Sequence, residues 1–174
     1  MGLLLCQWAK ALGATIVGTV STPEKAEVAK AAGCHFPVVR SEKSFVEVVR
    51  EVTDNEGCAV VYEAIGKDTL QDSLDTLRPM GTCAAYGHVS GPPDPIDIIQ
   101  DLGRRGSLFI TRPAIMHYVA KRADLEWTAR DLFKALGDQV ISANINYEYE
   151  LKDAVQAHTA IESGKTLGAS VLIP

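Results

Sequence analysis

Hydrophobic residues along this chain alternate between helical spacing and short continuous runs, which predicts helices and strands in regular alternation. The first pair is an amphipathic stretch over residues 3–12, closed by Gly13, followed by a β-branched run over residues 15–20. Further strands are expected where apolar residues run together between turn signals. These cover residues 35–39, 58–65, 82–87, 107–111, an extended piece near 141–145, and 169–173.

Helical spacing fills the intervals between these strands. Pro23 opens one helix that runs to Ala32, with Thr22 as its N-cap and Gly33 as its terminator. Another begins at Ser44, and others are expected over residues 67–77, 96–102, 124–136 and 153–163.

Strands separated by helices of this length predict β-α-β crossovers and an α/β fold with a doubly wound parallel sheet. Residues 58–65 are almost continuously apolar, which is typical of a central strand covered on both faces. Ligands of such sheets bind beyond the carboxyl ends of the strands. This rule selects residues 21–25, 40–41, 64–67, 86–90 and 110–113.

The opening helix and strand resemble the first helix and second strand of a dinucleotide-binding unit. In such a unit a glycine-rich loop precedes the helix and holds a pyrophosphate on backbone N–H groups. Gly2 is expected to be the last residue of that loop, and the first strand of the unit is not part of this sequence.

Composition narrows the class of function. The 174 residues are 47% apolar and 22% charged, with a net charge of −5, which argues against a nucleic-acid-binding surface. No apolar run approaches the roughly 20 residues that span a bilayer, and no signal peptide is recognised, so a cytoplasmic protein is expected. The four cysteines are scattered, which favours reduced core thiols over a zinc cluster.

The end of the second strand of the expected unit bears on the choice of cofactor. A site for NAD usually carries an acid there, but here hydroxyl groups come first. Ser21, Thr22, Lys25 and Arg40 form the donor set that a 2′-phosphate needs, which predicts NADPH. The alternative is that Thr22 only caps the helix and both cations are solvated.

Tyr86, Gly87 and His88 follow a predicted strand and are candidates for a wall of the cofactor site. Ala64 and the pair Ile110–Thr111 stand at two other strand ends. The alternative for the first three is a core tyrosine and a loop histidine. No catalytic residue can be assigned, since His35, His117 and His158 have no acidic or cysteine partner at useful spacing, and Glu63 and Asp68 do not make a glycosidase pair.

Several segments together resemble the zinc-free, NADPH-dependent quinone oxidoreductases of the medium-chain dehydrogenase/reductase superfamily. They are residues 6–14, 18–20 with Lys25, 60–63, 106–113 and 172–174. The resemblance covers almost the whole chain. It implies a Rossmann-like sheet, truncated at its N-terminus, with a C-terminal helix–strand appendage, and a division into residues 1–146 and 147–174.

The resemblance also implies hydride transfer from NADPH to quinones or related enones. By position, Ser21 and Lys25 match residues near the adenosine 2′-phosphate, and Arg40 replaces a frequent tyrosine. Lys165 stands beside Gly164, where some members carry a phosphate-binding arginine.

Members of this group carry a catalytic domain ahead of the cofactor domain and form homodimers through the strand that runs here from Ser107 to Thr111. Without that domain, the 174 residues alone are expected to be inactive. Two other readings remain open: another zinc-free member such as an enoyl reductase, or a non-catalytic dimerising module.

Overall fold

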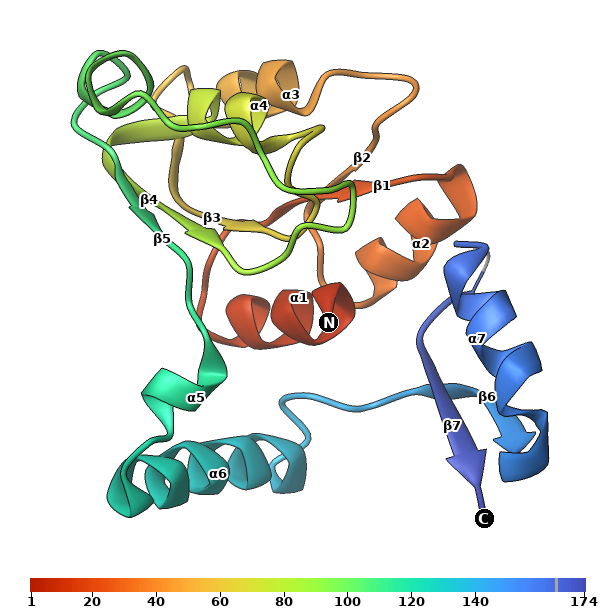
Figure 1. Ribbon diagram of the computed structural model, residues 1–174. Coiled ribbons are helices and arrows are strands. Elements are labelled where there is room, and N and C mark those ends of the chain that lie inside the picture. The colour runs from red at the N-terminus through yellow and green to blue at the C-terminus, as the bar shows by residue number, and fades with distance from the viewer. Residues whose placement is uncertain (165) are drawn as a thin grey trace. The chain divides into compact units, whose positions relative to one another are not determined.

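Helices and parallel strands alternate along the chain in the computed structural model, which describes residues 1–164 and 166–174 (Figure 1). Residues 1–39 and 131–174 form one unit, and residues 40–130 form a second. All strand pairs within the described residues are parallel. The predicted α/β class is therefore confirmed.

The first unit begins with two helices and two strands. They are α1 (Gly2–Ala11), β1 (Val17–Val20), α2 (Pro23–Ala31) and β2 (Phe36–Val39). Strands β1 and β2 pair in register from Val17 opposite Phe36 to Val20 opposite Val39. Helix α2 packs on both strands and buries Ala26 and Ala29, small side chains that allow a close approach. The Thr22 hydroxyl accepts a hydrogen bond from Lys25 N at 3.3 Å, so the predicted N-cap is present.

The C-terminal part of this unit is a second strand–helix–strand arrangement. It consists of β6 (Ile145–Glu150), the short 3₁₀ turn η2 (Leu151–Asp153), α7 (Ala154–Glu162) and β7 (Ala169–Ile173). Strands β6 and β7 pair in parallel, and α7 packs against both of them.

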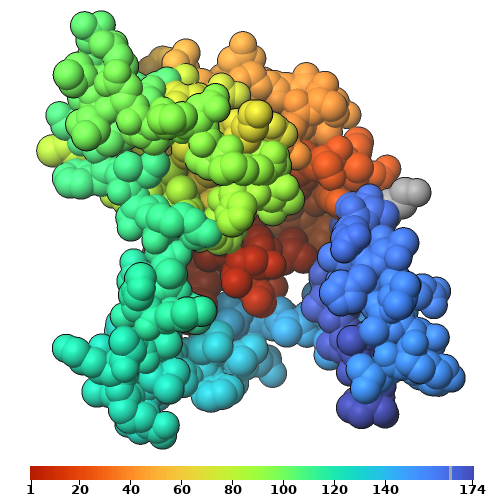
Figure 2. Space-filling view, viewed as in Figure 1, coloured from red at the N-terminus to blue at the C-terminus, as the bar shows by residue number. Residues whose placement is uncertain are grey.

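The second unit is built on a three-stranded sheet in the order β3-β4-β5. Its elements are α3 (Phe45–Val52), β3 (Cys58–Glu63), α4 (Leu70–Asp75), β4 (Leu77–Ala85), the π-helical turn η1 (Ile98–Gly103), β5 (Phe109–Thr111) and α5 (Ile115–Tyr118). Helices α3 and α4 lie over one face of this sheet (Figure 1). The turn η1 protrudes as a green knob in the space-filling view (Figure 2). Helix α6 (Arg122–Gly137) crosses from this unit into the first.

The core of the second unit lies between α4 and the sheet. Leucines from the helix, the strands and the loop before β5 surround a fully buried cysteine. The cluster consists of Leu70, Leu74, Leu77, Cys83 and Leu108. Its burial explains the spacing of leucines in this stretch of the sequence.

Several sequence expectations need correction. The helix expected over residues 67–77 is shorter, since it ends at Asp75 and Leu77 already belongs to β4. Leu70 and Leu74 of α4 and Leu77 of β4 nevertheless share one core, although they come from two different elements. The extended piece expected near residues 141–145 lies further along the chain, as β6. The helix α5 has no counterpart in the prediction.

Strand β3 is not covered on both faces, contrary to the expectation for an apolar central strand. Val60 is 46% exposed and Tyr62 is 61% exposed. Among the described elements of its unit, α4 packs on this strand from one side only. The strand also has a hydrogen-bonded partner along only one edge, because the strands form three separate ladders rather than one continuous sheet.

A buried carboxylate closes the carboxyl end of β3. Glu63 is only 4% exposed, and its side chain accepts hydrogen bonds from four donors. Its partners are Ile65 N at 2.5 Å, Gly66 N at 3.1 Å, Thr69 Oγ1 at 3.0 and 3.1 Å, and Ser73 Oγ at 2.5 Å. The carboxylate thereby joins the turn after β3 to the start of α4. Such hydrogen bonding offsets the cost of burying the charge.

We expect Glu63→Ala to lower the free energy of unfolding by about 3 kcal/mol or more, because it leaves buried amide and hydroxyl donors without an acceptor. Glu63→Gln should cost roughly half as much, since the amide oxygen still accepts and the Ser73 hydroxyl can reverse to accept from the amide. Denaturant unfolding measures both changes. Glu56→Gln, which removes an exposed ion pair to Arg78, is the control, with an effect below about 1 kcal/mol. Equal losses in Glu63→Ala and the control would contradict the assigned role.

Candidate functional site

The loops that follow β3 and β4 are joined to each other by backbone hydrogen bonds. Tyr86 N donates to Glu63 O at 2.9 Å, and Val89 N donates to Ala64 O at 3.3 Å. Ser90 adds two bonds to Ile65 O, one from its backbone N–H at 2.8 Å and one from its hydroxyl at 2.8 Å. The structure therefore brings together Ala64 and the Tyr86–Gly87–His88 segment, two sets of residues that the sequence selected separately.

Two glycines make this close approach of the loops sterically feasible. A Cβ atom on Gly87 would lie 2.3 Å from Ala64 O, and one on Gly66 would lie 2.6 Å from Gly91 O. Gly66 also has a φ of +93°, which favours glycine. A side chain at either position would push the two loops apart.

The third strand end of the sheet is tied to the second by an arginine. Arg112 Nη1 donates to Tyr86 O at 2.7 Å and to Pro113 O at 3.2 Å. The register of β4 and β5 places Ile110 opposite Cys83 and Thr111 opposite Ala84. Ala64, Tyr86 and Thr111 therefore mark three adjacent strand ends on one edge of the sheet.

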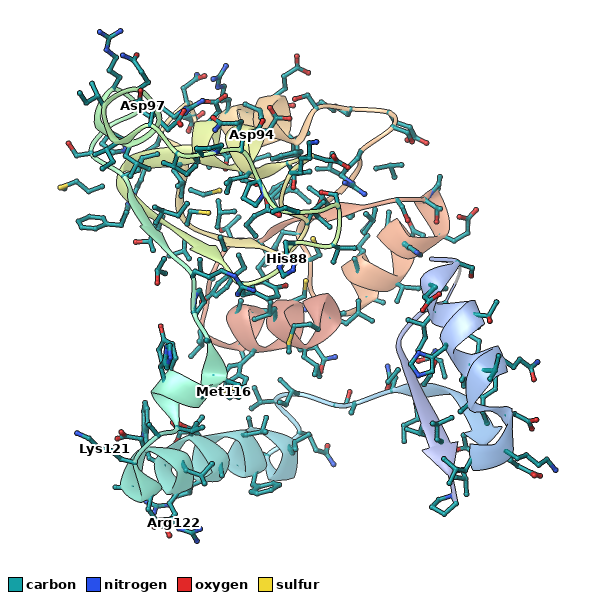
Figure 3. All side chains as sticks on the ribbon, viewed as in Figure 1. His88, Asp94, Asp97, Met116, Lys121 and Arg122 are labelled. Atoms are coloured by element: carbon teal, nitrogen blue, oxygen red, sulfur yellow. The ribbon has the colours of Figure 1, made fainter. Side chains whose placement is uncertain are left out.

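Side chains at this edge differ in exposure. His88 is exposed beyond β4, where Figure 3 labels it. Tyr86 is half-buried, and its burial together with the nearby Glu63 charge raises the pKa of its phenol. Tyr86 therefore stays neutral and can donate a hydrogen bond at neutral pH.

In the first unit, a lysine on the helix that follows β1 makes a contact with the C-terminal part of the chain. Lys25 Nζ donates to Gly164 O at 2.6 Å, which joins the first turn of α2 to the turn that follows α7. Ser21 is exposed directly after β1, and Thr22 caps α2. The structure thus brings Lys25 beside the turn that contains Gly164.

Three further residues from the sequence prediction stand apart from these contacts. Arg40 is exposed and directly follows β2, whose last residue pairs with the last residue of β1. Gly2 is the first residue of α1, and a Cβ there would meet no atom within 4 Å. Lys165 lies outside the described residues.

Sequence reasoning missed the residues that hold the strand ends in place. Glu63 was considered only as half of an unlikely acid pair, and Ser90 and Arg112 were included within the strand-end ranges 86–90 and 110–113, with no contact assigned to either. The one available signal was an acidic residue at the end of an apolar strand, followed within ten positions by a glycine, a threonine and a serine. Buried acids of this kind need such donors nearby.

A shallow cavity of about 330 Å³ adjoins the end of β5. It is lined by Thr111, Arg112, Pro113, Ala114, His117 and Tyr118. Met116 is labelled on the same short helix in Figure 3. Sequence reasoning assigned His117 no role, and the structure places it on the wall of an open depression at the strand end.

The donor sets present in the chain bear on which ligands it can hold. Within residues 1–164 and 166–174, no group of three or more His, Cys, Asp or Glu side chains is arranged to hold a metal ion.

In the same part of the chain, no helix combines the length and the apolar character that crossing a membrane requires.

Comparisons with known proteins point to one family of enzymes. The family model described as zinc-binding dehydrogenase matches residues 1–129. The chain is 50% identical over 174 residues to a 2-haloacrylate reductase from a Burkholderia species, covering all of this chain and 52% of that protein. It is 41% identical over 176 residues to a quinone oxidoreductase from Salmonella typhimurium, covering 54% of that protein.

Solved structures give the same result. The crystal structure of the Escherichia coli quinone oxidoreductase complexed with NADPH matches with a TM-score of 0.93 at 39% identity, over 99% of this chain and 53% of that one. The crystal structure of 2-haloacrylate reductase matches with a TM-score of 0.92 at 50% identity, over 99% of this chain and 54% of that one. The chain therefore spans about half the length of the relatives it matches.

The match of the family model over most of the chain and the parallel strands of the α/β fold agree with one another. This chain belongs to the zinc-binding dehydrogenase family, as the Rossmann-like cofactor-binding portion of the quinone oxidoreductase group of medium-chain dehydrogenases/reductases.

Proposed function

We propose that this chain binds NADPH and presents its nicotinamide for hydride transfer to an electron-poor double bond conjugated with a carbonyl, as in quinones and enones. The observation that carries the proposal is the joined set of strand ends at Ala64, Tyr86 and Thr111. A relative with this fold has been crystallised with NADPH, which supports the choice of cofactor.

The adenosine end of the cofactor belongs at the tip of β1 in this proposal. The ammonium group of Lys25 has three N–H donors, and its bond to Gly164 O uses one of them. Two donors remain for a phosphate, and Ser21 and the Thr22 hydroxyl add neutral donors. Arg40 follows the neighbouring strand β2 and can add a second cation. Lys165, adjacent to Gly164 in the sequence, belongs to the same proposed set.

The nicotinamide end belongs at the tips of β3, β4 and β5. Gly87 keeps the backbone free of a side chain where Ala64 approaches, and Tyr86 offers a flat face with a neutral hydroxyl. His88 is exposed beside them, and Ile110 and Thr111 offer backbone groups at the end of β5. The cofactor supplies the hydride, and these residues position it. The amino end of α1 at Gly2 is proposed to face the pyrophosphate, since helix N-termini favour anions.

The acceptor class rests on what the matched relatives have in common. Quinones and 2-haloacrylates both contain a carbon–carbon double bond conjugated with an electron-withdrawing carbonyl group. Relatives named for each of these compounds match the chain over its whole length. An enoyl reductase acts on a related double bond and remains the second candidate within the enzymes.

A non-catalytic dimerising module is the alternative from a different class. Titration calorimetry with NADPH separates the two readings. Saturable binding supports a cofactor site, whereas the absence of binding by a folded protein supports the module. NADH in a parallel titration reports the preference for the 2′-phosphate.

We expect Lys25→Ala to weaken NADPH binding about tenfold or more while leaving NADH binding nearly unchanged, because a charge-assisted contact to a phosphate contributes about 1.5–3 kcal/mol. The measurement is calorimetry with both cofactors. Lys30→Ala, on the last turn of the same helix, is the matched control and should not change the preference. Equal losses for NADH and NADPH in Lys25→Ala would refute the 2′-phosphate site.

We expect the isolated 174-residue polypeptide to lack quinone reductase activity. The chain covers 53–54% of the solved quinone oxidoreductase and 2-haloacrylate reductase structures. Holding two reactants in place can contribute about 7–11 kcal/mol to barrier lowering, and a missing half would remove the walls that do so. Loss of nicotinamide absorbance with benzoquinone is the assay, and turnover at an ordinary enzymatic rate in a preparation free of host reductases would overturn this expectation.

We propose that the protein forms a homodimer through the strand from Ser107 to Thr111. Among the described strands β5 pairs only with β4, so its other edge has no ladder partner there, and Phe109 on this strand is 60% exposed. Unpaired strand edges favour association.

A charge on that strand should therefore shift the dimer towards the monomer. We expect Phe109→Lys to weaken dimerisation at least about tenfold in sedimentation experiments, because it places a solvated cation in the interface. Val89→Lys, at an exposed loop position, is the control. A dimer equally stable in both variants would show that another surface forms the contact.

A further inference from the structure

Two thiols that are far apart in sequence meet in the first unit. Cys6 lies in α1, and Cys34 follows Gly33 just before β2. A Cβ atom on Gly33 would lie 3.4 Å from Cys6 O, which places the two chain segments in contact. The thiols of Cys6 and Cys34 are close enough for each to shift the pKa of the other.

Glycines on both sides allow this contact. A Cβ on Gly18 in β1 would lie only 2.9 Å from Cys34 Sγ, and one on Gly33 would lie 2.7 Å from Lys10 Cδ. Gly33 has a φ of +103°, so the turn itself also favours glycine. The sulfur of Cys34 thereby lies against the backbone of β1, with Ile16 O at 3.8 Å.

The two thiols differ in access. Cys34 is 2% exposed, whereas Cys6 is partly exposed on α1. A dissolved oxidant can therefore reach Cys6 but not Cys34. This asymmetry is what a pair consisting of an attacking thiol and a resolving thiol requires.

We propose that Cys6 and Cys34 form a redox-responsive pair, in which Cys6 reacts with a peroxide and Cys34 then closes an intramolecular disulfide. The site is separate from the strand ends proposed to bind the cofactor, and it does not depend on that function.

The electrostatics of the pair agree with these roles. The interaction with the Cys34 thiol lowers the pKa of Cys6 to about 7, against the opposing effect of partial burial. The same contact, together with burial, raises the pKa of Cys34. The cation of Lys10 lies one turn further along α1, and His35 beside Cys34 accepts a hydrogen bond from Ile16 N through Nδ1. When one thiol of the reduced pair ionises, the negative charge therefore lies on the sulfur of Cys6, the more exposed of the two.

The chemistry balances with hydrogen peroxide as the oxidant. The thiolate of Cys6 attacks one peroxide oxygen, the O–O bond breaks, and the released hydroxide takes a proton to become water. The Cys34 sulfur then attacks the sulfenic sulfur of Cys6 and loses its proton to the departing hydroxide, which leaves as a second water. Two thiols and one peroxide become one disulfide and two waters.

The product would join α1 covalently to the segment that leads into β2. Because the chain at Gly33, next to Cys34, already packs against Cys6, a local shift of the two side chains can bring the sulfurs to the roughly 2 Å length of a disulfide bond. Closing the intervening loop restricts the unfolded chain, so the oxidised form should melt roughly 5–10 °C higher than the reduced form.

The test treats the purified, reduced protein with hydrogen peroxide and maps its thiols by alkylation and peptide mass spectrometry. The four free thiols should fall to two, with one linked peptide containing Cys6 and Cys34. In Cys34→Ala, a sulfenic acid at Cys6 should instead be trapped by dimedone. Cys6→Ser should protect Cys34 from oxidation, and Cys58→Ser is the matched control that should still form the disulfide.

The pH dependence of alkylation gives a second readout. Cys6 should react with iodoacetamide with a midpoint near pH 7, and reaction should slow below this value as the thiolate is protonated. In Cys34→Ala the midpoint should move up towards that of an ordinary thiol, roughly 8.5. Wild-type protein that keeps all its thiols, links other cysteines, forms only intermolecular disulfides or stops at sulfinic acid on Cys6 would overturn the proposal, and this result does not depend on any variant folding.

Discussion

The arrangement of strand ends in the second unit depends on the hydrogen bonds that one buried carboxylate accepts. Glu63 ends β3 at a buried position, where a carboxylate without partners would be costly. The chain meets this need by turning sharply, so that amide and hydroxyl groups point back at the carboxylate. That turn fixes Ala64 and the start of α4. The loop after β4 is held to the turn by a hydrogen bond to Ala64 O, and Arg112 is held to that loop by its bond to Tyr86 O.

Much of the fold could be predicted because its local signals agree with its packing. Proline and threonine at the start of α2, with a glycine after its end, define a helix that the structure reproduces almost to the residue. The β1 and β2 runs are short and bounded by turn residues, and they pair in parallel as alternation with a helix requires. The strand ends, and with them most candidate site residues, followed from the same pattern.

Other features could not be predicted because they depend on neighbours distant in sequence. The run of β3 is apolar throughout, but apolarity does not reveal whether a covering element is present, and Tyr62 is exposed. The leucine spacing around Leu77 fits a helix and a buried strand end equally well. The contacts of Ser90, Arg112 and Lys25 join residues separated by 25, 26 and 139 positions. No local pattern encodes such contacts.

The division of the strands into three ladders also has a consequence for how the chain resists local opening. Backbone amides are protected from exchange with solvent by the ladder to which they belong. Here β1 with β2, β3 with β4 and β5, and β6 with β7 share no strand-to-strand hydrogen bonds among the described residues. Their amides can therefore exchange at three different rates, each set by its own helix and core. Hydrogen exchange would then divide this chain into separate cooperative segments, with the slowest amides beneath α4.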